Sequence, residues 1–202
     1  MGIYSENRAE YVISQFACMS DSVTVAPINH HATDVVSAKK IIEHTLLEVI
    51  CVSRNTLRQI VNMLSNEGLP KLNTIICFDN LSDDELHELL PEPRRPNIKV
   101  LFFEQIIDQF GDNSSIIEPQ IKKRPCADTI YLIMHTSGTR NEIKGAMLTH
   151  KNLLSGFANC DFYGYDYFDT DRFFSYVPFC HVFEQIMIGL AVVFGFSCGF
   201  MS

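Results

Sequence analysis

The sequence predicts an α/β fold in which helices cover both faces of a mostly parallel sheet. Short apolar runs of strand length alternate along the 202 residues with segments whose apolar residues recur at helical spacing. That alternation is typical of right-handed βαβ units. Hydrophobic residues make up 47% of the chain and charged residues 20%, which is the composition of a globular protein.

The individual elements follow from these patterns in chain order. Apolar runs predict strands at Gly2–Ser5, Val23–Ala26, Glu48–Val52, Thr74–Phe78, Lys99–Phe103, Thr129–His135, Phe173–Val177 and Phe196–Phe200. Helices are predicted between them at about 8–20, 33–45, 54–66, 82–90, 103–110, 150–160 and 182–193. The early part of this order equally fits a flavodoxin-like domain, so the fold class alone assigns no function.

The last 18 residues contain no charged side chain, and that length approaches a membrane span. Gly189, Gly195 and Gly199 interrupt the apolar run. The pattern favours a helix packed on the sheet, followed by a strand, over membrane insertion.

Charge and cysteine usage exclude several classes of protein. The net charge of −8 argues against a nucleic-acid partner, which would require basic patches. The seven cysteines form no CxxC pair and most lie in apolar runs, which indicates reduced cysteines in a cytoplasmic protein. No spacing of histidines or cysteines is typical of a metal site, so no metal ligand is predicted.

Residues 136–150 carry the clearest chemical signal of the chain. They read Thr-Ser-Gly-Thr-Arg-Asn-Glu-Ile-Lys-Gly-Ala-Met-Leu-Thr-His and lie between a predicted strand and a predicted helix. Glycines let a backbone approach an anion, hydroxyls donate hydrogen bonds and a lysine adds a full charge, so the segment suits phosphate. The order differs from the common P-loop, because Lys144 precedes Gly145. We predict strand, loop, helix and strand over residues 129–177, with Ser137–Lys144 in an exposed loop.

The segment instead resembles the Thr-Ser-Gly-Thr-Thr-Gly-x-Pro-Lys-Gly signature of adenylate-forming enzymes, the acyl-CoA synthetase superfamily. Residues 171–185, Asp-Arg-Phe-Phe-Ser-Tyr-Val-Pro-Phe-Cys-His-Val-Phe-Glu-Gln, are similar to a stretch of its long-chain branch. The opening Gly-Ile-Tyr-Ser-Glu-Asn-Arg-Ala-Glu-Tyr at residues 2–11 resembles that branch as well. The chain thus resembles a long-chain fatty acid–CoA ligase, and does so weakly between about 53 and 128.

The resemblance implies a two-step reaction in which a fatty acid and ATP form an acyl-adenylate and diphosphate, and coenzyme A then takes the acyl group. It implies ATP, Mg²⁺ and coenzyme A as cofactors, and a cytoplasmic protein that associates peripherally with the endoplasmic reticulum membrane. It places His181 beside the acyl pocket and the adenylate as the catalytic candidate. The phosphate-binding candidates that it implies are Thr136, Ser137, Gly138, Thr139, Arg140, Asn141, Lys144 and Gly145.

This sequence departs from the family pattern in two ways. Arg140-Asn141 replaces a Thr-Gly pair and Ile143 replaces a proline, although asparagine tolerates the left-handed conformation that glycine adopts. The family's aromatic-Gly-x-Thr-Glu motif and its ribose-binding aspartate are not found. Residues 1–202 are therefore expected to be an incomplete adenylation domain without the C-terminal catalytic domain, and inactive alone as an acid–thiol ligase. The alternatives are a non-catalytic module that binds nucleotide, acyl chains or a partner, and a membrane-associated interaction protein.

Overall fold

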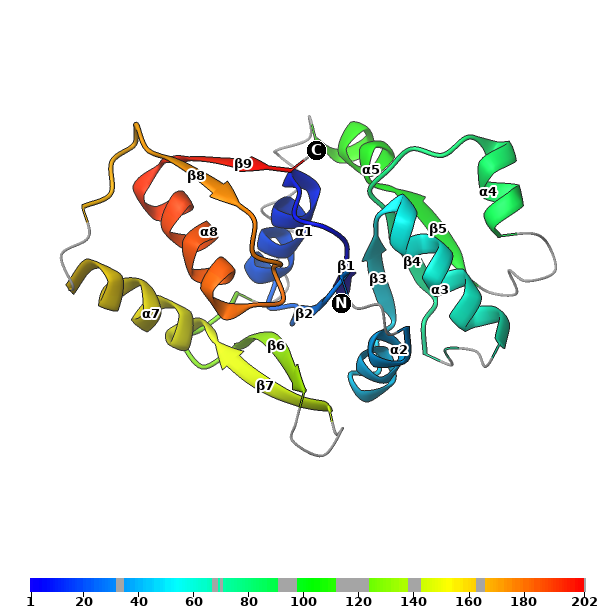
Figure 1. The fold of residues 1–202 in the computed structure, drawn as a ribbon, viewed down its shortest axis with the longest axis horizontal. Helices are drawn as coiled ribbons and strands as arrows, with labels where there is room; N and C mark the ends of the chain where they lie inside the picture. The colour runs from blue at the N-terminus through cyan, green and yellow to red at the C-terminus, as the bar shows by residue number, and fades with distance from the viewer. Residues whose placement is uncertain are drawn as a thin grey trace.

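A computed structural model describes residues 1–31, 35–66, 69, 71–90, 98–111, 124–137, 143–162 and 166–201 of the chain. Five parallel strands form the main sheet in the order β2-β1-β3-β4-β5, which is the order of flavodoxin-like sheets (Figure 1). The strands are β1 (Gly2–Tyr4), β2 (Ala26–Ile28), β3 (Val49–Val52), β4 (Thr74–Cys77) and β5 (Lys99–Phe102). Helices α1 (Ala9–Ser20), α2 (Val35–His44), α3 (Arg54–Asn66), α4 (Asp83–Leu89) and α5 (Phe103–Phe110) connect or follow them.

Two hydrophobic cores lie on the two faces of this sheet. Adjacent residues of a strand point to opposite faces, so Tyr4 enters one core and Ile3 the other, and both are fully buried. The first core packs α2 and α3 on the sheet, and the second packs α1 and α8 (Val182–Phe194) on it. The predicted fold class, a mostly parallel sheet with helices on both faces, is confirmed.

The second half of the chain joins the sheet through β6 (Ile130–Ser137). Val25, just before β2, forms a parallel bridge with Leu132: its N–H donates to Tyr131 O at 2.9 Å, and Ile133 N–H donates to Val25 O at 2.9 Å. Figure 1 shows β6 beside β2, with β7 (Ile143–Thr149) on the other side of β6. The strand predicted at Val23–Ala26 lies two to three residues later, at Ala26–Ile28, because these three residues are the ones that pair with Gly2–Tyr4 of β1.

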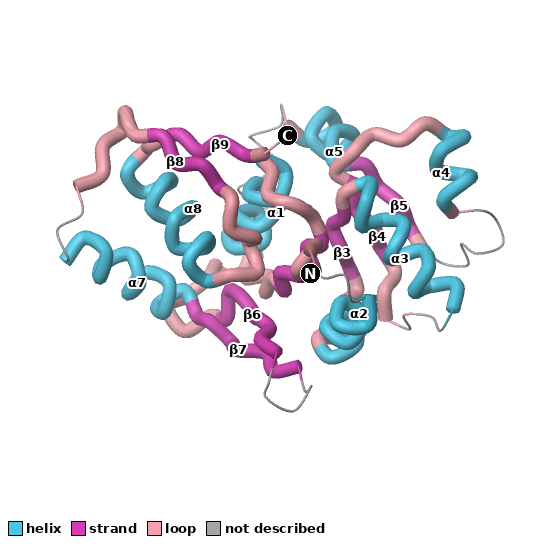
Figure 2. The backbone as a smooth tube through the Cα atoms, viewed as in Figure 1, coloured by secondary structure: helices cyan, strands magenta, loops and turns pink. Residues whose placement is uncertain are grey.

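The remaining elements are α7 (His150–Phe162), β8 (Arg172–Ser175) and β9 (Ser197–Phe200). Strands β8 and β9 form a separate parallel pair, and α8 packs between this pair and α7 (Figure 2). The apolar C-terminal segment thus forms the predicted helix and strand. Gly195 ends α8 in the left-handed conformation, at φ 78°, where glycine avoids the strain of a side chain. Within the described ranges, no helix has both the length and the apolar character to cross a bilayer.

The prediction of an exposed loop over Ser137–Lys144 is wrong at both ends. Strand β6 runs to Ser137 and β7 begins at Ile143, and the two strands pair in antiparallel register. Pairing satisfies the backbone N–H and C=O groups that a loop would leave to water. The strand is absent from the sequence-based prediction because Ile143–Thr149 includes a glycine and was expected to lead from a phosphate loop into a helix. Residues 138–142 lie outside the described residues.

Candidate functional site

The β6–β7 hairpin brings two of the predicted phosphate-binding residues together. Thr136 and Lys144 are directly opposite each other in the antiparallel register, and both side chains are exposed. Residues that face each other in this way project from the same side of the hairpin, with Cβ atoms roughly 5 Å apart. The two side chains therefore project into solvent from the same face of the hairpin. Among the other predicted residues, Ser137 is paired with Ile143, and Gly138, Thr139, Arg140 and Asn141 lie outside the described residues.

Gly145 has a packing role in the hairpin. It is paired with His135, and a Cβ at this position would stand 2.8 Å from Ile133 Cγ2 and 3.3 Å from His135 Nε2. The missing side chain lets Ile133 and His135 lie against the β7 backbone. Burial, and the neighbouring His44, lower the pKa of His135, so this imidazole is held in its neutral form. Gly145 thereby allows close packing within the strand pair that carries Lys144.

His181, the predicted catalytic residue, lies in a different element, directly before α8. It occupies the N-cap position with extended backbone (φ −99°, ψ 133°), its imidazole makes no capping hydrogen bond, and its side chain is exposed. Its backbone N–H donates to Pro178 O at 2.9 Å and its carbonyl accepts from Glu184 N–H at 3.1 Å. The imidazole therefore takes its position from the turn that precedes the helix.

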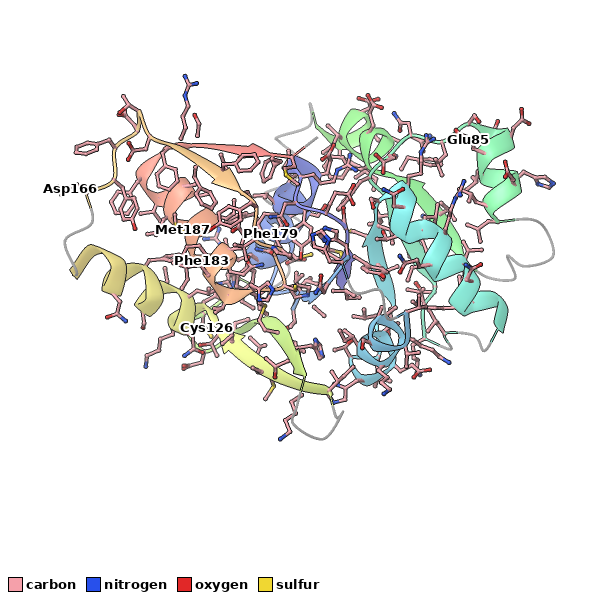
Figure 3. All side chains as sticks on the ribbon, viewed as in Figure 1. Glu85, Cys126, Asp166, Phe179, Phe183 and Met187 are labelled. Atoms are coloured by element: carbon pink, nitrogen blue, oxygen red, sulfur yellow. The ribbon has the colours of Figure 1, made fainter. Side chains whose placement is uncertain are left out.

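Buried polar side chains hold this turn in place, and sequence reasoning missed them. The Gln185 Nε2 group donates to Phe179 O at 2.6 Å, and the Gln15 Nε2 group donates to Gln185 Oε1 at 2.7 Å and to Tyr131 OH at 2.6 Å. Phe179 is packed inside the second core, and Figure 3 shows it in the interior of the half of the molecule that contains α8. These bonds tie the turn before α8 to α1 and to β6.

A second group of buried polar atoms lies next to the first. The Ser175 hydroxyl donates to Glu184 Oε1, and Asn7 Nδ2 donates to Ser175 Oγ at 2.8 Å. Glu184 is fully buried. Burial raises the pKa of its carboxyl, and the Ser175 hydroxyl and the Val177 backbone offset part of that rise. A polar pair, Glu184 and Gln185, in an otherwise apolar helix was the signal in the sequence that could have indicated this network.

Glu184→Gln is expected to change how stability depends on pH. A buried acid whose folded pKa is raised binds its proton more tightly in the folded state, so it destabilises the protein as pH rises above its unfolded value of about 4.3. Glutamine keeps an oxygen for the Ser175 hydroxyl but cannot ionise. The free energy of unfolding of the variant, from urea titrations at several pH values, should therefore rise relative to the parent between about pH 4.5 and 7. Glu48→Gln, an exposed site with the same charge change, is the control; a constant difference between Glu184→Gln and parent across that range would refute the expectation.

An apolar cavity of about 220 Å³ lies beside the network. Gln15, Tyr131, His150 and Gln185 are among the residues that line it, and the remaining lining comes from apolar residues of α1, α7 and α8. Gly189 is part of this lining, where a Cβ would stand 2.0 Å from Phe157 Cζ, so the glycine lets the Phe157 ring lie against α8. The cavity is smaller than the roughly 300–1,000 Å³ of sites that enclose a whole drug-sized ligand.

No cluster of three or more His, Cys, Asp or Glu side chains that could hold a metal ion occurs where side chains are described. The six cysteines with described side chains are all free thiols.

The sequence of the chain matches a known family and several of its members. The family model described as AMP-binding enzyme matches residues 1–202. Fatty acyl-CoA synthetase B of Dictyostelium discoideum is 32% identical over 100% of this chain, and the peroxisomal long chain acyl-CoA synthetase 6 of Arabidopsis thaliana is 30% identical over 99% of it. The chain spans only 28% and 27% of the length of these two relatives.

A solved structure supports the same fold. The A-PCP didomain of carboxylic acid reductase from Segniliparus rugosus, in complex with AMP, superimposes with a TM-score of 0.76. The match covers 100% of this chain and 29% of that one at 20% sequence identity, so it bears on the fold alone. A family model that covers every residue, together with this shared fold, leads to one assignment: the chain belongs to the AMP-binding enzyme family.

Proposed function

We propose that this chain is part of an ATP-dependent acid–thiol ligase that converts long-chain fatty acids to acyl-CoA. The observation that carries the proposal is the side-by-side exposure of Thr136 and Lys144 on the β6–β7 hairpin. A hydroxyl donor next to an ammonium group can bind a phosphate oxygen through one neutral and one charge-assisted hydrogen bond. The relatives named above are fatty acyl-CoA synthetases, which is the basis for proposing a long-chain acid as the substrate.

In the proposed reaction, a carboxylate oxygen of the fatty acid attacks the α-phosphorus of ATP. The bond from the α-phosphorus to the bridging oxygen breaks and diphosphate leaves, giving an acyl-adenylate. The thiol of coenzyme A then attacks the acyl carbonyl, loses its proton, and AMP leaves. Both steps move negative charge onto phosphate, and positioned cations and hydrogen-bond donors stabilise such charge. Lys144 and Thr136 would supply this stabilisation, together with Ser137, Gly138, Thr139, Arg140 and Asn141 of the same segment.

His181 and the cavity are proposed to serve the acyl side of the reaction. The exposed imidazole at the start of α8 would lie beside the adenylate, and the apolar cavity near Gln185 would take part of the aliphatic chain. Bound Mg²⁺ would supply further charge neutralisation at the phosphates. The described side chains do not provide a ligand set for that ion, so we assign it none.

A non-catalytic acyl-binding module is the second candidate, and the apolar cavity is the observation that favours it. Such a module would bind an aliphatic ligand without requiring Lys144. We also propose, from the resemblance alone, a cytoplasmic protein with peripheral association with the endoplasmic reticulum membrane. Binding of ATP separates the first candidate from the second.

The experiment is equilibrium titration of the purified chain with ATP by calorimetry, next to Lys144→Ala. Loss of one charge-assisted hydrogen bond of roughly 1.5–3 kcal/mol should weaken binding by about 10- to 150-fold. Lys151→Ala is the matched control, because Lys151 is an exposed lysine on α7 and its loss changes the net charge equally. Absence of saturable ATP binding by the parent, or an equal loss in both variants, would count against the proposed function.

A further inference from the structure

The side chain of Asn7 reaches across the molecule to the turn that precedes His181. Its Nδ2 group donates to Ser175 Oγ at 2.8 Å and to Val177 O at 2.7 Å, and its Oδ1 accepts from Phe179 N–H at 3.1 Å. These partners lie 168 to 172 positions further along the sequence. Asn7 is itself buried, so its hydrogen bonds are not shared with bulk water.

We propose that Asn7 is a positioning residue for His181. Its side-chain amide holds the backbone of residues 177–181 in place, and this backbone determines where the His181 imidazole lies. Apart from the proposed role of His181, the inference rests only on the hydrogen bonds of the turn. The His181 side chain makes no capping bond of its own, so its place follows from the backbone of residues 177–181. A side chain that fixes this backbone therefore fixes where the imidazole can be.

Only an amide suits this position. The Ser175 hydroxyl has a single proton, which it donates to Glu184, so it can only accept from Asn7. Val177 O is also an acceptor, whereas Phe179 N–H is a donor. Two acceptors and one donor require an NH₂ group and an oxygen on the same side chain. This pattern also fixes which way the amide points.

A second side chain, that of Gln185, also hydrogen-bonds to the backbone of this turn. Gln185 Nε2 donates to Phe179 O, so the peptide groups on both sides of Phe179 are held by side chains from different elements. Since Gln185 comes from α8 and Asn7 from the segment between β1 and α1, the turn is fixed relative to the main sheet as well as to its own helix.

The test uses nuclear magnetic resonance of the full 202-residue chain, labelled with ¹⁵N and with ¹³C-histidine. Asn7→Asp keeps an acceptor for Phe179 N–H but sets a carboxylate against the Ser175 and Val177 oxygens. We expect the backbone N–H signals of Phe179 and His181 and the imidazole signal of His181 to move at pH 7. At low pH they should move back toward the positions of the parent measured at the same pH, because the protonated carboxyl regains one donor. If Asn7→Asp only disrupted the local fold, lowering the pH would not bring these signals back toward those of the parent.

Two further variants keep the inference falsifiable. Asn7→Ser is the milder change if Asn7→Asp does not fold, and it should speed amide exchange of Phe179 N–H by several-fold to roughly tenfold, as for one lost hydrogen bond. Thr56→Ala is the matched control: Thr56 is a buried polar residue whose hydroxyl donates to Tyr4 O, away from the turn. If the His181 signals stay in place in the Asn7 variants, or move equally in Thr56→Ala, the inference is wrong. ATP titration of the same samples tests the proposed function separately, because the His181 signals can be read without ligand.

Discussion

The purified 202-residue chain is expected to form no palmitoyl-CoA from palmitate, ATP and coenzyme A above the uncatalysed background. The chain spans 27–28% of the length of the related acyl-CoA synthetases, and its described side chains offer one lysine, one hydroxyl and one imidazole for the proposed reaction. Stabilisation of developing charge by several convergent groups is usually the largest catalytic contribution. Losing most of those groups should lower the rate by many powers of ten.

The measurement is ATP- and coenzyme A-dependent conversion of radiolabelled palmitate by the parent chain, with Lys144→Ala assayed beside it. Turnover by the parent that disappears in the variant would contradict the expectation. It would show that the chain assembles a complete site from groups that we have not assigned. A signal that is equal in both samples would instead point to a contaminating ligase.

Leu132→Ala is expected to lower the free energy of unfolding by roughly 2–5 kcal/mol, the range for a buried leucine truncated in a packed core. Leu132 is fully buried in the second core, at the point where β6 bridges Val25. The cavity left behind would therefore weaken both the core and the attachment of the hairpin to the main sheet. Urea unfolding followed by far-ultraviolet circular dichroism measures the effect, since the chain contains no tryptophan for fluorescence.

Met147→Ala is the control for this change. Met147 lies on β7 and its side chain is 64% exposed, so its truncation should alter stability by no more than about 0.5 kcal/mol. Should Leu132→Ala cost as little as Met147→Ala, the bridge between β6 and Val25 would not be an important contact in solution.

Most of the fold could be predicted because its signals are local. Apolar runs such as Thr74–Cys77 and the acidic first turn after Ser82 mark their elements without knowledge of the rest of the chain. Strand β7 was missed for the opposite reason. Four of its seven residues are polar, glycine or alanine, and it is a strand because β6 lies beside it. Pairing with a partner strand, rather than the propensity of the residues, decides the structure there.

The residues of the candidate site also differ in whether a local sequence pattern marks them. Thr136, Lys144 and His181 belong to short motifs that are visible in the sequence. Asn7 and Gln15 could not be assigned to the site, because their partners lie about 170 residues away and no local pattern reports such a contact. A buried polar residue is satisfied by whatever the folded chain brings to it.

The hydrogen bonds of Asn7 and Gln15 also set an order of events during synthesis on the ribosome. Translation at about 5–20 residues per second leaves the nascent β1–α1 segment without these partners for roughly 10 to 30 seconds. During that time one face of the growing sheet, with Ile3 and Tyr11, lacks the residues of α7 and α8 that later cover it. A chain interrupted before residue 175 would lack α8 and would leave the part of this apolar face that α8 covers exposed permanently. Chaperones or proteases that recognise exposed apolar surface would act on it.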